Sequence, residues 1–198
     1  MVFKTVAMSH WEDKYRAMTI PWDRGAASPA LLGWIEDGVL LPGRVLIPGC
    51  GRGHEALELA RRGFQVTALD IAPTALEHLA AELHTAGVDA ERVCADALAW
   101  QADQPFDAIY EQTCLCALDP AHWAAYEQQL FNWLRPDGKL FALFMQVERP
   151  GGPPFHCALP DMRTLFSSER WQWPEAEPRQ VVHPDNILEL AAVLTRRA

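Results

Sequence analysis

The chain has 198 residues, of which 49% are hydrophobic and 22% charged, and its formal net charge at pH 7 is −9. This length and composition suit a soluble globular protein with a sizeable core, so residues 1–198 are predicted to form one domain. The acidic balance disfavours binding to nucleic acid or to an anionic membrane. The five cysteines have no disulfide or metal-ligand spacing, so we expect reduced thiols, no metal site, no membrane span and a cytoplasmic location.

Two helices are predicted near the N-terminus, at Met8–Arg16 and Ser28–Gly38, with the loop Thr19–Asp23 between them. The loop contains Pro21, which excludes the helical conformation at the residue before it. Pro29 suits the first turn of the second helix. Residues 1–40 are therefore predicted to form a helical lid segment within the domain.

Strands and helices then alternate along the chain. The strands are predicted at Arg44–Ile47, Gln65–Leu69, Glu91–Ala95, Phe106–Glu111 and Lys139–Gln146, and the helices at His54–Arg62, Pro73–Thr85, Ala121–Leu134 and Pro160–Phe166. A turn at Arg135–Gly138 is expected to separate the third of these helices from the strand that follows it. Two last segments, Trp171–Glu175 and Ile187–Arg196, are typical of an antiparallel pair, although the second could be helical.

This alternation predicts the α/β class. The expected architecture is a Rossmann-like, doubly wound, mostly parallel seven-stranded sheet with an antiparallel C-terminal strand and an N-terminal helical cover.

The most informative stretch is the glycine-rich turn Gly49–Gly53, which follows a predicted strand and precedes a predicted helix. Glycines let the backbone turn sharply and let a ligand approach main-chain N–H groups. Asp70 ends the next strand, where an acidic side chain can accept hydrogen bonds from ribose hydroxyls. This layout predicts a nucleotide-type cofactor site.

Two details of the turn favour a cofactor without phosphates. A nicotinamide site usually has the pattern G-x-G-x-x-G, but the third glycine here, Gly53, comes one residue early. Glu55 then follows where a pyrophosphate would need a positive field. S-adenosylmethionine carries a sulfonium, an ammonium and a carboxylate but no phosphate, so the turn favours methyl transfer over hydride transfer.

Further motifs surround this turn, and together they cover nearly the whole chain: Trp11–Tyr15, Thr19–Asp23, Ser28-Pro29, Val45–Gly53, Leu69–Ala72, Phe106–Thr113 and Gly151–Phe155. With them the chain resembles the thiopurine S-methyltransferase family of class I S-adenosylmethionine-dependent methyltransferases, which includes thiol and halide methyltransferases. The tryptophan-bearing N-terminal segment and the G-G-P-P-F loop are the most specific parts of the resemblance.

The resemblance implies S-adenosylmethionine as the cofactor and a set of residues that bind it. These are Trp11, Trp22, Gly49, Cys50, Gly51, Asp70, Ile71, Asp96, Ala97, Glu111 and Gln112. Within this set, Asp70 would accept the ribose hydroxyls, Asp96 would bind the adenine amino group, and Glu111 would face the transferred methyl group. The residues implied to cover the substrate are Tyr15, Trp22, Pro153, Pro154 and Phe155.

Each of these roles has a plainer structural interpretation. Trp11 and Tyr15 stand four residues apart on one helix face, and such aromatic pairs are more often part of a core. Asp96 lies in a strand-to-loop turn, where aspartate is common in any case. Gln112 is uncharged where some relatives carry arginine, so its part in binding the cofactor carboxylate is open.

The expected reaction is methyl transfer to a small soft nucleophile: a thiol, a thiopurine-like compound, a halide, thiocyanate or a chalcogen oxyanion. A thiolate needs alignment in a dry pocket more than it needs a base, so no catalytic residue is assigned with certainty; Glu111 and His156 are candidates. An O- or N-methyltransferase with His156 as base and a non-catalytic S-adenosylmethionine-binding protein remain as alternatives. The partner is expected to be a small molecule, and the sequence is compatible with a monomer.

Overall fold

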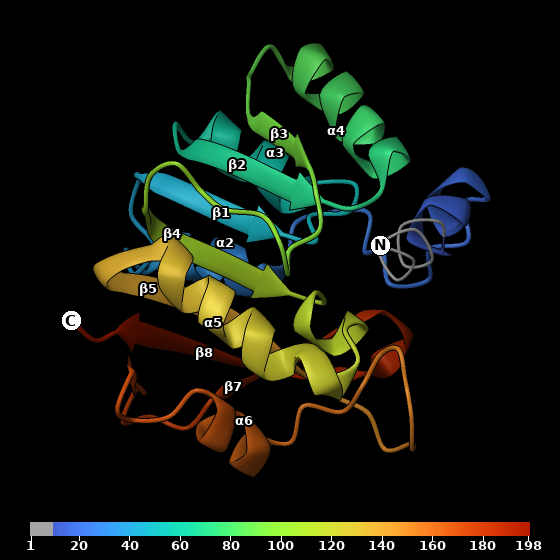
Figure 1. Cartoon of the computed structure of the whole chain (residues 1–198). Coiled ribbons are helices and arrows are strands. Elements are labelled where there is room, and N and C mark those ends of the chain that lie inside the picture. The colour runs from blue at the N-terminus through green and yellow to red at the C-terminus, as the bar shows by residue number, and fades with distance from the viewer. Residues whose placement is uncertain (1–9) are drawn as a thin grey trace. The chain divides into compact units, whose positions relative to one another are not determined.

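The computed structural model describes residues 10–198, and the chain forms two compact units, one ending at Trp100 and the other spanning Gln101–Ala198 (Figure 1). The prediction that the whole chain forms one domain stays a prediction. Within the described residues, no helix is both long enough and apolar enough to cross a membrane.

The first unit has a three-stranded parallel sheet in the order β3-β2-β1 (Figure 1). A helical segment at residues 10–16 comes first, followed by α2 (Pro29–Glu36), β1 (Arg44–Pro48), α3 (His54–Arg61), β2 (Gln65–Asp70), α4 (Pro73–Ala86) and β3 (Glu91–Cys94). Both α3 and α4 pack against β2 and against each other. Met8 and Ser9, which the sequence places in the first helix, lie outside the described residues.

Local sequence explains these elements. The residues of β1 after Arg44 and those of β2 after Gln65 are all buried, which is typical of strands in a parallel sheet covered on its faces. Helix α4 begins at Pro73 and ends before Gly87, whose left-handed φ of 67° terminates it. Because the strands are parallel, the carboxyl ends of β1, β2 and β3 meet at one edge of the sheet.

The second unit contains β4 (Phe106–Gln112), α5 (Trp123–Trp133), β5 (Leu134–Gln146), α6 (Leu159–Leu165), β6 (Trp171–Gln172), β7 (Arg179–Val182) and β8 (Leu188–Arg196), with short 3-10 helices at Leu115–Ala117, Pro120–His122 and Pro184–Asn186. Strand β4 runs parallel to β5, whereas β8 runs antiparallel to β5. Both β6 and β7 pair with β8 in the antiparallel sense.

The α/β class, the parallel strands and the antiparallel C-terminal strand are confirmed. The ambiguous segment Ile187–Arg196 is a strand, and it forms the predicted closing pair, with Trp171 opposite Arg196. Its partner is shorter than predicted, since β6 ends at Gln172. The described residues contain eight strands where seven were predicted; the extra one, β7, is four residues long and mostly exposed, so its sequence carries little apolar signal.

The predicted turn at Arg135–Gly138 is wrong. Strand β5 already begins at Leu134, which pairs with Phe106. The pairing register then shifts between Phe106 and Ala108, and Asp137 adopts a left-handed φ of 61°. The Pro-Asp-Gly sequence therefore forms an irregularity inside a strand, because the flanking residues are held in the sheet on both sides.

Candidate functional site

The glycine-rich turn after β1 has the backbone conformation that its sequence predicts. Gly49, Gly51 and Gly53 all have left-handed φ values, of 60°, 53° and 73°. A Cβ at Gly51 would lie 2.7 Å from the Tyr15 hydroxyl, and one at Gly53 would lie 2.6 Å from Leu79 Cδ1. The third glycine therefore allows α3 to pack closely on α4, although it comes one residue earlier than in a nicotinamide site.

Asp70, at the carboxyl end of β2, holds this turn in place. Its Oδ2 accepts a hydrogen bond from Gly51 N at 2.8 Å, and its Oδ1 accepts one from Ala72 N at 2.9 Å. The residue is 6% exposed, and burial raises its pKa although the backbone hydrogen bonds lower it. Each carboxylate oxygen can accept more than one hydrogen bond, so Asp70 keeps acceptor capacity for a ligand.

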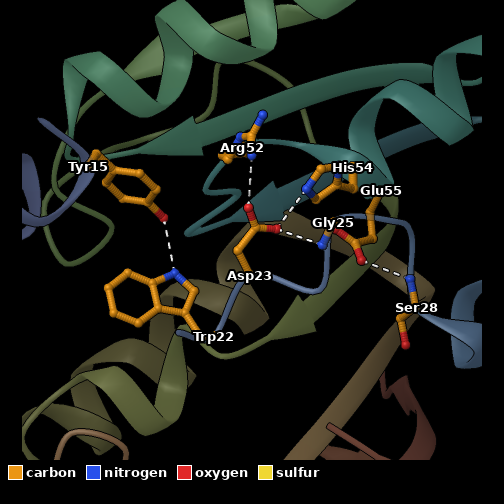
Figure 2. Close-up of polar contacts among 8 residues, drawn as sticks. All are labelled: Tyr15, Trp22, Asp23, Gly25, Ser28, Arg52, His54 and Glu55. Atoms are coloured by element: carbon orange, nitrogen blue, oxygen red, sulfur yellow. Dashed lines mark hydrogen bonds and ion pairs between the residues drawn. The ribbon is translucent and has the colours of Figure 1, made fainter. Parts of the chain in front are cut away.

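Aromatic side chains from the N-terminal segment pack together, and Tyr15 among them lies against the glycine turn. Tyr15 is buried and packs with Ala72, and burial together with the nearby Asp70 carboxylate raises its pKa well above the ordinary value. Trp22 Nε1 donates a hydrogen bond to the Tyr15 hydroxyl at 3.4 Å (Figure 2). Trp11 meets Trp22 edge to face with a centroid distance of 5.4 Å. Tyr15 thus belongs to the core, as the plainer interpretation predicts, and also contacts the turn; its role in covering a ligand stays a prediction.

A carboxylate in the Thr19–Asp23 loop connects this aromatic group to the turn. Asp23 Oδ2 accepts from Arg52 Nη1 at 3.1 Å, and Asp23 Oδ1 lies 2.7 Å from His54 Nε2 (Figure 2). Sequence reasoning missed these contacts. The only signal in the sequence is the pair of basic residues in and just after the glycine motif, Arg52 and His54.

Two further acids attach the N-terminal segment to the rest of the first unit. Glu12 accepts hydrogen bonds from Thr74 N at 3.0 Å and Thr74 Oγ1 at 2.7 Å, at the start of α4. Glu55 accepts one from Ser28 N at 2.9 Å (Figure 2). The sequence placed Glu55 where it would repel a pyrophosphate; the structure shows that its carboxylate binds the backbone ahead of α2.

The residues implied for the adenine side lie at the same sheet edge. Ala95 N donates to Asp70 O at 3.0 Å, which brings the segment after β3 beside the end of β2. Asp96 Oδ1 accepts from Leu98 N at 2.9 Å, so Asp96 also has the structural role of stabilising its own turn. Ala97 lies within that turn, and Ile71 O lies 3.9 Å from Cys94 Sγ.

In the second unit, Glu111 is buried at the end of β4, with 2% exposure. It accepts a hydrogen bond from Leu115 N at 2.7 Å and another from the backbone of Cys114, so it caps the following 3-10 helix. Burial nevertheless raises the pKa of Glu111 to about 7. This buried carboxyl can therefore change its protonation state near neutral pH.

Gln112 belongs to a side-chain network within the second unit. Its Nε2 donates to Glu189 Oε2 at 2.7 Å, and its Oε1 accepts from the Tyr110 hydroxyl at 2.7 Å. Glu189 lies on β8 and is fully buried. Sequence reasoning did not identify Glu189, because the position of β8 in the sheet follows only from long-range pairing.

The G-G-P-P-F loop folds back on itself and on the first 3-10 helix. A Cβ at Gly152 would lie 2.5 Å from the Phe155 ring, and Phe155 N donates to Cys116 O at 2.7 Å. Pro153 is exposed and its carbonyl accepts from Arg149 Nη2 at 3.2 Å, while Pro154 is half-buried.

His156, the candidate base, is exposed, and its Nδ1 accepts a hydrogen bond from Val147 N at 3.2 Å. The neutral ring then carries its proton on Nε2, which leaves no lone pair for accepting a substrate proton. The geometry therefore counts against His156 as a general base.

The chain was compared with known proteins. Residues 6–195 match the family model described as Thiopurine S-methyltransferase. Thiocyanate methyltransferase 1 of Brassica oleracea is 33% identical over 160 residues, covering 79% of this chain and 70% of that protein. A thiopurine S-methyltransferase of Legionella pneumophila is 27% identical over 163 residues, covering 73% of this chain and 74% of the relative.

Solved structures share the fold. The Burkholderia thailandensis 1,6-didemethyltoxoflavin-N1-methyltransferase, solved with S-adenosylhomocysteine, has a TM-score of 0.80 at 19% identity and covers 99% of this chain and 89% of its own. The matches to the curated relatives and to the family model extend over both units. The chain therefore belongs to the thiopurine S-methyltransferase family and is an S-adenosylmethionine-dependent methyltransferase.

Proposed function

We propose that this protein transfers a methyl group from S-adenosylmethionine to a small soft nucleophile: a thiol, a thiopurine-like compound, a halide, thiocyanate or a chalcogen oxyanion. The observation that carries the proposal is the hydrogen bond from Gly51 N to Asp70, which joins the glycine turn to the end of β2 beneath the aromatic group. The names of the relatives, thiocyanate, thiol and thiopurine methyltransferases, support a soft acceptor.

The residues of the first unit fit the methyl donor in three respects. Asp70 has acceptor capacity left for ribose hydroxyls, and its backbone partners hold the carboxylate in one orientation. Among the residues that the structure describes, none accepts a hydrogen bond from the buried Nε of Arg52, a donor that suits the carboxylate of the methionine moiety. The turn that follows β3 contains Asp96 and Ala97 and lies at the same sheet edge as Asp70, where these two residues would bind the adenine ring.

S-adenosylmethionine supplies a methyl group that is already activated on a sulfonium. The chain's own residues must then orient the two reactants and exclude water. The indole rings of Trp11 and Trp22 meet edge to face, and they are proposed to cover the donor and to offer π faces to its sulfonium. As the family resemblance implies, Glu111 and Gln112 are proposed to face the methionine moiety and the transferred methyl group, and the G-G-P-P-F loop is proposed to cover the acceptor.

The two alternatives have less support. An O- or N-methyltransferase would need a base, and the hydrogen bond to His156 Nδ1 occupies the lone pair that this role requires. The likeness to a family of methyltransferases extends over both units, and this favours an enzyme over a non-catalytic binding protein. For the acceptor we propose a small molecule in the cytoplasm, where five cysteines without disulfide spacing would stay reduced.

An activity screen with methyl-labelled S-adenosylmethionine tests the proposal. The purified chain is assayed with thiols, thiopurines, thiocyanate, iodide and tellurite, with phenols and amines of similar size as controls. We expect turnover on one or more soft nucleophiles and none on the controls. Turnover confined to phenols or amines would contradict the soft-nucleophile assignment, and tight donor binding without any methyl transfer would support the non-catalytic alternative.

A further inference from the structure

Asp23, to which the proposed function assigns no role, is the centre of a polar cluster (Figure 2). One carboxylate oxygen lies 3.1 Å from Arg52 Nη1, and the other lies 2.7 Å from His54 Nε2. Gly25 N also donates to this carboxylate, at 2.9 Å. The three side chains are mostly shielded from solvent, with 13%, 28% and 21% exposure for Asp23, Arg52 and His54.

The hydrogen bonds of this cluster hold the pKa of Asp23 below its usual range, so the carboxylate is charged at neutral pH. An ion pair in water contributes little to stability, whereas a shielded carboxylate with several donors fixes the geometry of the groups it joins. The groups joined here are the Thr19–Asp23 loop and the glycine turn.

This connection begins one residue after Trp22. Trp22 immediately precedes Asp23 and contacts Trp11 and Tyr15 through its ring edges and its Nε1. The Tyr15 hydroxyl in turn lies against Gly51. The aromatic group is therefore attached to the same turn at two places, through Tyr15 and through Asp23.

The helical segment at residues 10–16 has its own attachment, because Glu12 binds Thr74 at the start of α4. Loss of Asp23 would leave that attachment and the Tyr15 packing in place. It would release mainly the loop that carries Trp22, which is only half-buried. The consequence would be local to the aromatic group rather than a loss of the fold.

We infer that Asp23 is a positioning residue for the methyl donor: by binding Arg52 and His54, it holds Trp22 over the glycine turn. Asp23 itself does not touch the donor. The inference rests on the proposed donor site and adds the residue that fixes the position of Trp22 at that site.

The test uses the full chain with Asp23→Asn, Asp23→Glu, His54→Ala and the double variant Asp23→Asn/His54→Ala. The matched control is Glu58→Gln, which removes the charge from the pair between Glu58 on α3 and Arg62 just after α3, 2.7 Å apart, without touching the loop. The measurements are the dissociation constant of S-adenosylhomocysteine by calorimetry, kcat and the donor KM with an acceptor that the wild type methylates, and the thermal midpoint.

For Asp23→Asn we expect a donor KM and a dissociation constant raised about tenfold to 100-fold, the range for loss of a hydrogen bond to a charged group. The value of kcat at saturating donor should change little, because the contact contributes equally to ground state and transition state. Asp23→Glu should recover part of the affinity. The double variant should bind no more weakly than Asp23→Asn alone, because His54 acts through Asp23.

A dissociation constant for Asp23→Asn within twofold of wild type, or additive losses in the double variant, would overturn the inference. So would a loss of affinity that tracks a lowered thermal midpoint, which indicates a merely structural role. A wild-type chain that does not bind S-adenosylhomocysteine would instead overturn the proposed function, and this inference with it.

Discussion

Individual residues of the candidate site have structural roles beside the ligand-binding roles proposed for them. Asp70 holds the glycine turn through Gly51 N, and Asp96 stabilises its own turn through Leu98 N. Glu111 likewise caps a 3-10 helix through Leu115 N. At these positions the plain and the functional interpretations are therefore not exclusive. A backbone that binds a ligand has to be fixed first, and a carboxylate with two oxygens can do both.

At the residue scale, Asp70→Asn tests the double role. The amide removes one acceptor and the charge, so both the hydrogen bond to Gly51 N and the ribose contacts weaken. We expect the dissociation constant of S-adenosylhomocysteine, measured by calorimetry, to rise about 10- to 100-fold, the range for one hydrogen bond to a charged group. Asp89→Asn is the control, because that side chain is 92% exposed. Equal affinities for wild type and Asp70→Asn would remove Asp70 from the donor site.

At the scale of elements, the packing of α3 on α4 depends on the glycine that precedes α3. Gly53 has a left-handed φ of 73° and leaves no room for a Cβ beside Leu79. Gly87, after α4, has a similar φ of 67° but open space around it. An alanine at Gly87 would meet only the cost of the left-handed backbone conformation, whereas an alanine at Gly53 would also meet the cost of overpacking against Leu79.

Gly53→Ala should therefore destabilise the protein more than Gly87→Ala. The left-handed conformation alone costs an alanine roughly 1–2 kcal/mol, and overpacking against a buried leucine adds roughly 1–3 kcal/mol. Urea unfolding gives the free energy of unfolding for each variant and for wild type. If both variants lose the same free energy of unfolding, the close approach of α3 to α4 adds no cost to an alanine at position 53.

The whole molecule contains several shielded carboxyls whose pKa values are raised, mainly by burial: Glu55, Asp70, Glu111 and Glu127. For an acid whose pKa is higher in the folded state, the folded state binds the proton more tightly. Its contribution to stability is complete below the unfolded pKa and is lost as the pH rises through the folded pKa. The molecule as a whole should therefore become less stable between mildly acidic and neutral pH as these groups ionise.

Glu111 allows a quantitative test, since its pKa rises from an ordinary 4.5 to about 7. Ionisation of this group should lower the free energy of unfolding by roughly 3 kcal/mol between pH 4.5 and pH 8. Glu111→Gln keeps an acceptor for Leu115 N and cannot ionise, so its urea unfolding should depend less on pH by about that amount. The exposed Glu175→Gln is the control. Parallel pH profiles for wild type and Glu111→Gln would contradict the raised pKa.

The sequence by itself determined the α/β class, most element positions, the glycine turn with Asp70, and the family resemblance. These depend on local pattern: apolar runs for strands, Pro73 and Gly87 at the ends of a helix, and left-handed glycines in the turn. The tertiary structure decided where the polar side chains bind. It paired Asp23 with Arg52 and His54, Glu12 with Thr74, and Gln112 with Glu189.

In the tertiary structure Arg135–Gly138 is part of β5 and not the predicted turn, and β7 pairs with β8. These outcomes depend on partners that lie far away in the chain, and the energy of a hydrogen bond or ion pair in a folded protein depends on how well both groups are shielded from water. Composition and spacing carry no information on that shielding. The local chemistry of the glycine turn could therefore be predicted from the sequence, whereas the long-range contacts of the polar side chains could not.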